Sequence, residues 1–424
     1  MSNAQANTTA GRTFRFACSS REIDLAKALL ADQGYVYEPE RFSPLAMRLV
    51  HEPKPLGNSI ANFFGLIYIQ DKSSMLPPLL LAPAPGTAVL DMCASPGGKT
   101  GLLAQSTGPA GFVLANEPNR SRLETLRRTL DRTNALPCGT CGAPGETLPL
   151  PDDTWPAILL DPPCSGLGTL DKHPEARRWQ GDKAAPLVHL QRALLTRAAA
   201  LLAPGGTLLY STCTTSPAEN EEQTAWAIEH LGLELSPLAL PQGFALRSPA
   251  IADLDGVLPV DGEASGSQGF YLARFTKSAT ASTTPFLFNP SAKGDVLSAA
   301  EQVACTAAGV TLSSLPPGSA RRFGESLFLV HAQAATHLPP EFPWQGLPLG
   351  RFQAGRFRPN PRLRILLPGS PDCAVHADSI NDLERLLAGQ ALCTPKSPNA
   401  ALLYKDIPLC RLNTKGKRAL WAER

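Results

Sequence analysis

From Thr87 onward, the chain alternates short runs of β-forming residues with helical stretches, and this alternation limits the folds open to it. The expected strands are Ala88–Met92, Phe112–Asn116, Ala157–Leu160 and Thr207–Thr212. The expected helices are Ser121–Asn134, Ala184–Leu202 and one entered through Ser216, Pro217 and Glu219, a capping box with proline at the first helical position. Strands that alternate with helices predict an α/β fold whose mostly parallel sheet is covered on both faces.

Residues that can carry chemistry follow directly after these strands. They are Asp91–Lys99, Glu117, Asp161–Cys164 and Cys213. In open parallel sheets, ligands bind outside the carboxyl ends of the strands. We therefore expect these residues to meet at one edge of the sheet.

The glycine turn Asp91–Thr100 follows a strand and opens a helix, so its backbone amides can face a ligand. A phosphate-binding loop would need glycine five residues before Gly98, where Cys93 stands, and this disfavours nucleotide hydrolysis. A structural turn without a ligand is the plain alternative. Glu117 ends the next strand, where an acid commonly accepts the ribose hydroxyls of a nucleoside-type cofactor. An acid at that place can also be solvated or cap a helix.

Two cysteines stand at the ends of the last two strands. In Asp161–Gly166, Pro162 and Pro163 restrict the backbone where it leaves a buried strand, which suits an accurately placed side chain. Cys213 precedes a helix start, and a helix N-terminus lowers the pKa of a thiol. A single cysteine at a strand end is more often part of the core. Two cysteines beside a cofactor pocket favour a catalytic role for these thiols.

A thiolate, a second thiol and a carboxyl group meet the needs of methylation at carbon 5 of cytosine. That carbon is a poor nucleophile until a thiolate adds at carbon 6. A carboxyl group at the base N3 assists the addition, and a base must later remove the carbon 5 proton. Cys213, Cys164 and Asp161 could supply these groups.

On these residues, the chain resembles the bacterial 16S rRNA cytosine-5 methyltransferases (RsmB/RsmF-like), which share a catalytic domain with the NOL1/NOP2/Sun proteins. The motifs are Ile69–Met75, Asp91–Thr100, Asp161–Leu170, His173–Glu175, Ser211–Thr214 and Gly269–Phe275. The resemblance as a whole covers about residues 14–277. The resemblance implies a Rossmann-like S-adenosylmethionine methyltransferase domain.

The same resemblance implies roles for individual residues. Cys213 is the implied nucleophile, Cys164 helps to release the product, and Asp161 faces both cofactor and cytosine. S-adenosyl-L-methionine is the implied cofactor, bound by Cys93, Ala94, Ser95, Pro96, Gly97, Gly98, Lys99, Glu117 and Asp161. In DNA cytosine methyltransferases the proline-cysteine thiol attacks instead.

Two segments depart from the family pattern. The family usually has an aspartate near the adenine between residues 134 and 150, and here Leu136–Gly142 has none. Cys138 and Cys141 in that segment form one CxxC pair, and a zinc site would need a second pair, so no metal is expected. An acidic loop, residues 253–263, replaces a shorter connection of the family.

We expect four parts in the chain: an N-terminal extension over 14–80, mainly helical with an irregular tail, a methyltransferase domain over 81–277, a linker over 278–294, and a C-terminal region over 295–424. In the extension, Ser20 is the expected cap of a helix that stops at Gly34. The C-terminal region resembles the α+β, PUA-like RNA-binding appendage of rRNA members. The arginines expected to contact phosphates are Arg351, Arg356, Arg358, Arg362 and Arg364. A solvated basic face is the alternative.

The overall charge and composition of the chain further restrict its possible substrates and location. The 424 residues carry a net charge of only +2, so an RNA substrate depends on local charge. Apolar runs are broken before the length of a membrane span, and ten irregularly spaced cysteines favour reduced thiols, so we expect a cytoplasmic protein without a membrane partner. A large RNA substrate favours a monomer. Small-subunit rRNA is the favoured substrate; tRNA is the alternative, and a non-catalytic RNA-binding or ribosome-assembly factor is the alternative of another class.

Overall fold

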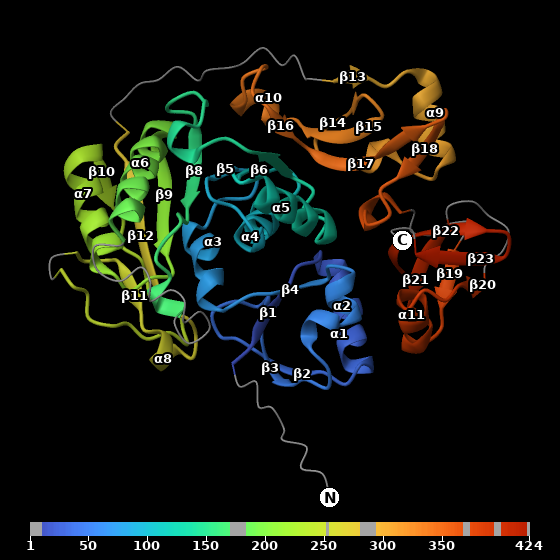
Figure 1. Cartoon of the computed structure of the whole chain (residues 1–424), viewed down its shortest axis with the longest axis horizontal. Helices are drawn as coiled ribbons and strands as arrows, with labels where there is room; N and C mark the ends of the chain where they lie inside the picture. The colour runs from blue at the N-terminus through green and yellow to red at the C-terminus, as the bar shows by residue number, and fades with distance from the viewer. Residues whose placement is uncertain are drawn as a thin grey trace, which may run out of the picture.

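The computed structural model describes residues 11–169, 184–251, 254–279, 294–367, 374–393 and 400–421 (Figure 1). Four sequence features fall partly or wholly outside these ranges. They are Leu170 of the Asp161–Leu170 motif, the His173–Glu175 motif, most of the expected linker and Asp253 of the acidic loop. No helix within the described ranges has the length and apolar content needed to cross a membrane.

A nine-stranded sheet forms the centre of the molecule, with the order β10-β12-β9-β8-β5-β6-β7-β16 and β11 paired to β12. Its strands are β5 (Ala88–Asp91), β6 (Phe112–Asn116), β7 (Cys138–Cys141), β8 (Trp155–Leu160), β9 (Leu202–Thr212), β10 (Leu233–Leu235), β11 (Leu258–Val260), β12 (Phe270–Lys277) and β16 (Trp344–Gln345). The five strands from β9 to β7 pair in parallel, and the others join antiparallel. The expected mostly parallel sheet is confirmed.

Helices cover both faces of this sheet, and their apolar side chains build two cores. One face carries α3 (Leu76–Leu81), α4 (Gly98–Thr107) and α5 (Arg120–Arg132), and the other carries α6 (Ala185–Leu201) and α7 (Glu221–Leu231). Leu126 and Leu130 of α5 are buried on the first face, and Leu194 and Leu195 of α6 on the second. Burial on both faces explains why the central strands read as continuous apolar runs.

The capping box expected at Ser216 is absent. Ser216 precedes a short 3-10 turn, Pro217–Glu219, without capping it through its side chain, and α7 begins only at Glu221. The Glu219 carboxylate points instead toward Ser165. The proline at the start of the turn is as expected.

The N-terminal extension is a four-stranded antiparallel sheet with helices, and the expectation of a mainly helical segment with an irregular tail was wrong. Its strands follow the order β2-β3-β1-β4 and its helices lie between them. They are β1 (Thr13–Phe16), α1 (Ile23–Asp32), β2 (Val36–Pro39), β3 (Ala46–His51), α2 (Ile60–Phe63) and β4 (Ile67–Ile69). Ser19, not Ser20, makes the capping box with Glu22 ahead of α1. The sheet was missed because β1 pairs with strands more than 30 residues away.

The acidic segment before Gly269 is folded where it is described. Its residues form β11 and α8 (Gly262–Ser265), and β11 pairs with β12. The Asp261 side chain caps α8 by accepting the backbone N–H of Ala264 at 2.9 Å.

The C-terminal region contains two further five-stranded sheets and fits a PUA-like α+β fold. The first sheet has the order β13-β14-β15-β17-β18, and the second has the order β19-β21-β22-β23-β20. The first is made of β13 (Asp295–Val296), β14 (Gly318–Phe323), β15 (Ser326–His331), β17 (Leu347–Gln353) and β18 (Arg356–Pro359), with α9 (Ala299–Ala307) and α10 (Ala334–His337). The second is made of β19 (Ala374–Ala377), β20 (Leu392–Cys393), β21 (Ala401–Tyr404), β22 (Ile407–Lys415) and β23 (Arg418–Trp421), with α11 (Ile380–Leu387).

Two parts of the C-terminal region, β16 and the last sheet, pack on earlier parts of the chain. β16 adds to the central sheet by pairing with β7. The last sheet lies beside the N-terminal extension in Figure 1, and residues of both form one hydrophobic core that includes Phe14, Leu29, Leu383 and Trp421. The C-terminal region is therefore docked at two places.

Candidate active site

The motif residues predicted to converge do meet at the carboxyl ends of β5, β6, β8 and β9. Lys99 Nζ, on the first turn of α4, lies 2.7 Å from Asp161 Oδ2, after β8. Ser211 at the end of β9 donates to Asp161 Oδ1 at 2.8 Å. Burial lowers the pKa of Lys99 and the facing Asp161 carboxylate raises it; the net pKa lies above its ordinary value. Lys99 is therefore a cation inside the site.

The two cysteine sulfurs lie 3.3 Å apart. A hydrogen bond from the Cys164 thiol lowers the pKa of Cys213, and the positive charge of Lys99 adds to the effect. The same contact raises the pKa of Cys164, which is also buried. Cys213 is thus the thiol that ionises first, with neutral Cys164 as its hydrogen-bond donor.

The loops that carry the cysteines are close enough to require glycine at Gly168. Its N–H donates to the carbonyl of Cys213 at 3.0 Å, and its own carbonyl accepts the N–H of Gly269 at 3.0 Å. A Cβ atom at Gly168 would lie 2.5 Å from the Gly269 oxygen. The motifs around Cys164, Cys213 and Gly269 therefore form one unit.

Two other motifs that the family shares, Ile69–Met75 and Asp91–Thr100, also contact residues around Gly269. Asp71 Oδ1 accepts the N–H groups of Ser73 at 3.1 Å and Gln268 at 3.2 Å. Lys99 Nζ lies 5.5 Å from the ring centroid of Phe270, within range of a cation–π contact.

The glycine turn is tied to the start of α5. Gly97 has a φ of +106°, which favours glycine, and it is the N-cap residue of α4. Ser95 Oγ donates to the carbonyl of Arg122 at 3.0 Å, and the N–H of Ala94 donates to the carbonyl of Asn116 at 2.9 Å. Burial raises the pKa of the Cys93 thiol well above its ordinary value, so this third cysteine stays protonated.

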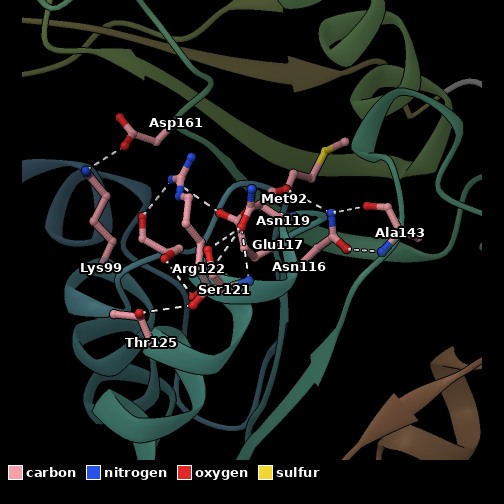
Figure 2. Close-up of polar contacts among 11 residues, drawn as sticks. Met92, Lys99, Asn116, Glu117, Asn119, Ser121, Arg122, Thr125, Ala143 and Asp161 are labelled. Atoms are coloured by element: carbon pink, nitrogen blue, oxygen red, sulfur yellow. Dashed lines mark hydrogen bonds and ion pairs between the residues drawn. The ribbon is translucent and has the colours of Figure 1, made fainter.

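Glu117 follows β6 and is buried, 3 % exposed. One of its oxygens accepts the N–H of Asn119 at 2.9 Å, and the other lies 3.2 Å from Arg122 Nη2 (Figure 2). Lys99, Glu117 and Asp161 thus belong to one polar region that runs from β6 to β8 (Figure 2). The two partners of Glu117, Asn119 and Arg122, were not among the candidate site residues predicted from the sequence.

Asp91 is a polar residue of this region that sequence reasoning did not single out as a ligand. It is 1 % exposed, and its Oδ2 accepts Thr100 Oγ1 at 2.7 Å, while Oδ1 is buried without a hydrogen-bond partner among the described residues. Burial raises the pKa of Asp91 to about 7. An unpaired buried carboxylate oxygen fits a cationic group of a ligand, such as the α-ammonium of S-adenosylmethionine. The sequence feature that could have identified Asp91 as a ligand is its position at the end of β5.

The segment that lacks the expected aspartate is held by Asn116. Its amide nitrogen donates to the carbonyls of Met92 at 3.2 Å and Ala143 at 3.0 Å, and its Oδ1 accepts the N–H of Ala143 at 3.1 Å (Figure 2). Cys138 and Cys141 lie in β7 and pack in different hydrophobic clusters, on opposite faces of the sheet. They cannot share one metal ion.

The five predicted phosphate-binding arginines divide into two sets. Arg351, Arg356 and Arg358 are exposed on β17 and β18, as an RNA contact requires. Arg364 is buried, with its Nε 2.6 Å from Glu22 and its Nη1 bonded to the Phe64 carbonyl. Arg362 stacks over the rings of Phe63 and Trp421. The structure gives Arg362 and Arg364 internal partners, which disfavours phosphate contact at these two positions.

A mostly parallel sheet with a glycine turn after its first strand, an acid after the second and a polar cluster at the strand ends defines the Rossmann-like S-adenosylmethionine-dependent methyltransferases. Comparison with known proteins narrows this class. The family model described as 16S rRNA methyltransferase RsmB/F matches residues 78–276.

The chain is similar to two curated proteins named ribosomal RNA small subunit methyltransferase F. It is 33 % identical to that of Cronobacter sakazakii over 282 residues, 65 % of this chain and 58 % of the relative. It is 33 % identical to that of Shewanella oneidensis over 256 residues, 59 % of this chain and 54 % of the relative. The alignments thus span between half and three fifths of these relatives.

A solved structure of a related methyltransferase supports the same family. A methyltransferase homologue from Pyrococcus horikoshii is 32 % identical, with a TM-score of 0.55, and the match covers 63 % of this chain and 87 % of that chain. The chain belongs to the RsmB/F-like family of NOL1/NOP2/Sun methyltransferases.

Proposed function

We propose that this protein methylates carbon 5 of cytosine in RNA, with small-subunit rRNA as the substrate. The observation that carries the proposal is the pair of sulfurs 3.3 Å apart beside the Lys99–Asp161 ion pair. A methyltransferase that acts on oxygen or nitrogen has no need of two thiols. Curated relatives named ribosomal RNA small subunit methyltransferase F support the choice of RNA.

The cofactor site is built from Asp91, the turn Cys93–Lys99, Glu117 and Asp161. S-adenosylmethionine supplies an electrophilic methyl group when bound. Asp91 Oδ1, which has no hydrogen-bond partner in the described part of the chain, can accept its ammonium group, and Glu117 can accept ribose hydroxyls at the end of β6. The turn contributes backbone N–H groups near the start of α4.

Cys213 is the nucleophile in this proposal. Its lowered pKa favours the thiolate, which adds to carbon 6 of cytosine and makes carbon 5 nucleophilic. Asp161, oriented by Lys99 and Ser211, takes up a proton and donates it in a hydrogen bond to N3 of the base during the addition. Ser211 and Lys99 therefore act by positioning Asp161.

Cys164 is the base that removes the carbon 5 proton. In the free enzyme the neighbouring Cys213 raises the pKa of Cys164. Once Cys213 is bonded to carbon 6, its sulfur no longer carries the negative charge, so this cause disappears and Cys164 becomes more acidic. Cys164 then releases its own proton to solvent, and the resulting thiolate takes up the carbon 5 proton. Loss of the proton then allows the bond between Cys213 and carbon 6 to break.

Bisulfite sequencing of total RNA from cells with and without the gene tests the proposal. Complementation with wild-type protein and with Cys213→Ala gives the matched pair. We expect one cytosine of small-subunit rRNA to lose its methyl group on deletion, and only the wild-type gene to restore it. Loss at a tRNA position would keep the chemistry and replace the substrate. If no cytosine changes, the proposal fails and a non-catalytic RNA-binding or ribosome-assembly factor becomes the leading hypothesis.

A further inference from the structure

We propose that Glu219 is the positioning residue that sets the distance between the Cys164 and Cys213 sulfurs. The inference deepens the proposed function, on which the importance of that distance for the reaction rests. Glu219 is a fully buried carboxylate, 0 % exposed, in the 3-10 turn before α7. It does not cap that turn through Ser216, so its burial needs another explanation.

The partners of Glu219 come from both thiol loops. Its Oε2 accepts the backbone N–H of Ser165, the residue after Cys164, at 2.9 Å. Its Oε1 accepts the Ser165 hydroxyl and lies 3.4 Å from the hydroxyl of Thr214, the residue after Cys213. The two hydroxyl oxygens are 2.7 Å apart. One carboxylate thus joins the two residues that follow the two thiols.

A third contact extends this network to α6. The Gln191 side-chain amide donates to Glu219 Oε2 and to the carbonyl of Pro163, both at 3.0 Å. Pro163 directly precedes Cys164, so the Cys164 loop is held on both sides of the thiol. Charge-assisted hydrogen bonds of this kind are stronger than neutral ones and offset the cost of burying the carboxylate.

The contact geometry predicts different results for two substitutions. Oε2 faces two N–H donors, which cannot reverse their direction. Oε1 faces two hydroxyls, which can accept as well as donate. Glu219→Gln can therefore keep the network, with its oxygen toward the N–H groups and its NH2 toward the hydroxyls. Glu219→Ala leaves these donors without an acceptor.

Cross-linking of the two thiols measures their placement without any RNA. Diamide oxidises two thiols to a disulfide and is itself reduced to a hydrazine, taking up the two protons and two electrons. Mass spectrometry then follows the peptide pair that contains Cys164 and Cys213. For Glu219→Ala we expect this disulfide to form about 10- to 100-fold more slowly, because a displacement near 1 Å can cost about 100-fold in rate.

Two variants control this result. Glu219→Gln should cross-link close to the wild-type rate. Glu221→Ala should do the same, because Glu221 is equally buried but contacts Arg247 and Ala250 instead of the thiol loops. A wild-type rate in Glu219→Ala, or an equal loss in Glu221→Ala, would overturn the proposal.

Thr214→Val covers the case in which Glu219→Ala does not fold. Valine nearly matches the shape of threonine and removes the hydroxyl that faces Ser165 and Glu219 and that also accepts the N–H of Ser216 at 3.2 Å. Slower cross-linking in Thr214→Val is expected, and an unchanged rate contradicts the inference.

RNA containing 5-fluorocytidine separates this inference from the proposed function. Fluorine at carbon 5 cannot be removed as a proton is, so the adduct with Cys213 persists on a denaturing gel. Slow adduct formation in Glu219→Ala, with near-normal rates in Glu219→Gln, supports both statements. If wild-type enzyme forms no adduct while cross-linking still depends on Glu219, the positioning stands and the proposed reaction fails.

Discussion

Lys99 Nζ and Asp161 Oδ2 lie 2.7 Å apart, and their ion pair joins the glycine turn after β5 to the proline loop after β8. The two residues are 62 positions apart in the chain. The pair places a positive charge near Cys213 and leaves Asp161 bonded to Ser211. One contact therefore couples the cofactor side of the site to the thiol side.

Lys99→Met should raise the pKa of Cys213. The positive charge of Lys99 favours the thiolate, so its removal shifts ionisation of Cys213 to higher pH. Alkylation of Cys213 by iodoacetamide, followed by mass spectrometry across a pH series, gives the midpoint. Lys99→Arg keeps the charge and should stay closer to the wild-type curve. An unchanged midpoint in Lys99→Met would show that the charge does not act on this thiol.

Cys213→Ala and Cys164→Ala should fail at different steps. Without Cys213 no thiolate adds to carbon 6, so we expect neither turnover nor a covalent complex. Without Cys164 the carbon 5 proton stays and the enzyme remains bonded to RNA. Denaturing electrophoresis with labelled RNA distinguishes the two, and Cys93→Ala serves as a cysteine control that forms no lasting adduct. A Cys164→Ala enzyme that releases its product normally would remove the role proposed for that thiol.

Binding of S-adenosylmethionine should weaken as pH falls through about 7. The pKa of Asp91 is raised to about 7, and only its ionised form attracts the ammonium group. Titration calorimetry should give an affinity about tenfold lower at pH 6 than at pH 8, since each pH unit below the pKa removes most of the carboxylate. In Asp91→Asn we expect weak binding with little dependence on pH over this range. Equal affinity of the wild type at both pH values is the contrary result.

Unliganded protein should respond to pH in the opposite sense. The pKa of Asp91 is higher in the folded chain than its ordinary value of 3.8, so the folded state binds the extra proton between about pH 4 and 7. Its contribution to stability is complete below the lower value and is lost as pH rises through about 7. Urea unfolding at pH 5.5 and 7.5, compared with Asp91→Asn, measures it. A wild-type difference that Asp91→Asn reproduces in full would assign the effect to other groups.

Arg364→Ala should destabilise the protein, whereas Arg358→Ala should weaken RNA binding. The Arg364 guanidinium is buried against Glu22, and removing one partner of a buried pair costs about 3–5 kcal/mol. Arg358 is exposed, so its loss removes at most a phosphate contact and lowers the salt dependence of binding. Denaturant unfolding and RNA titration at two salt concentrations separate the effects. Equal stability of the two variants would contradict the structural role of Arg364.

Local sequence pattern was sufficient to predict four of the five parallel strands of the central sheet. The expected strand Phe112–Asn116 coincides with β6, and the helix expected at Ala184–Leu202 differs from α6 by one residue at each end. β7 was not expected, because Cys138–Cys141 contains glycine and lies in a segment without clear alternation. Its place in the sheet comes from pairing with β6 and β16.

The role of a side chain was harder to predict where the same residue suits two different structural interpretations. Glu219 three residues after Ser216 suits a capping box, yet its carboxylate reaches Ser165, 54 residues earlier. Arg362 and Arg364 belong to a basic run that suggests an RNA surface, yet they contact Phe63 and Glu22. No local pattern distinguishes a buried arginine from an exposed one when its partner lies some 300 residues away.

The sequence by itself determined the α/β alternation, the glycine turn and the placement of Asp161, Cys164 and Cys213 after strands, because hydrophobic period, proline and glycine act over a few residues. Only the tertiary structure decided that the two sulfurs meet, that no described residue pairs with the Asp91 Oδ1 oxygen, and that Glu219 links both thiol loops. These features depend on contacts between distant segments. Their burial and hydrogen bonding follow from the packing of the whole chain.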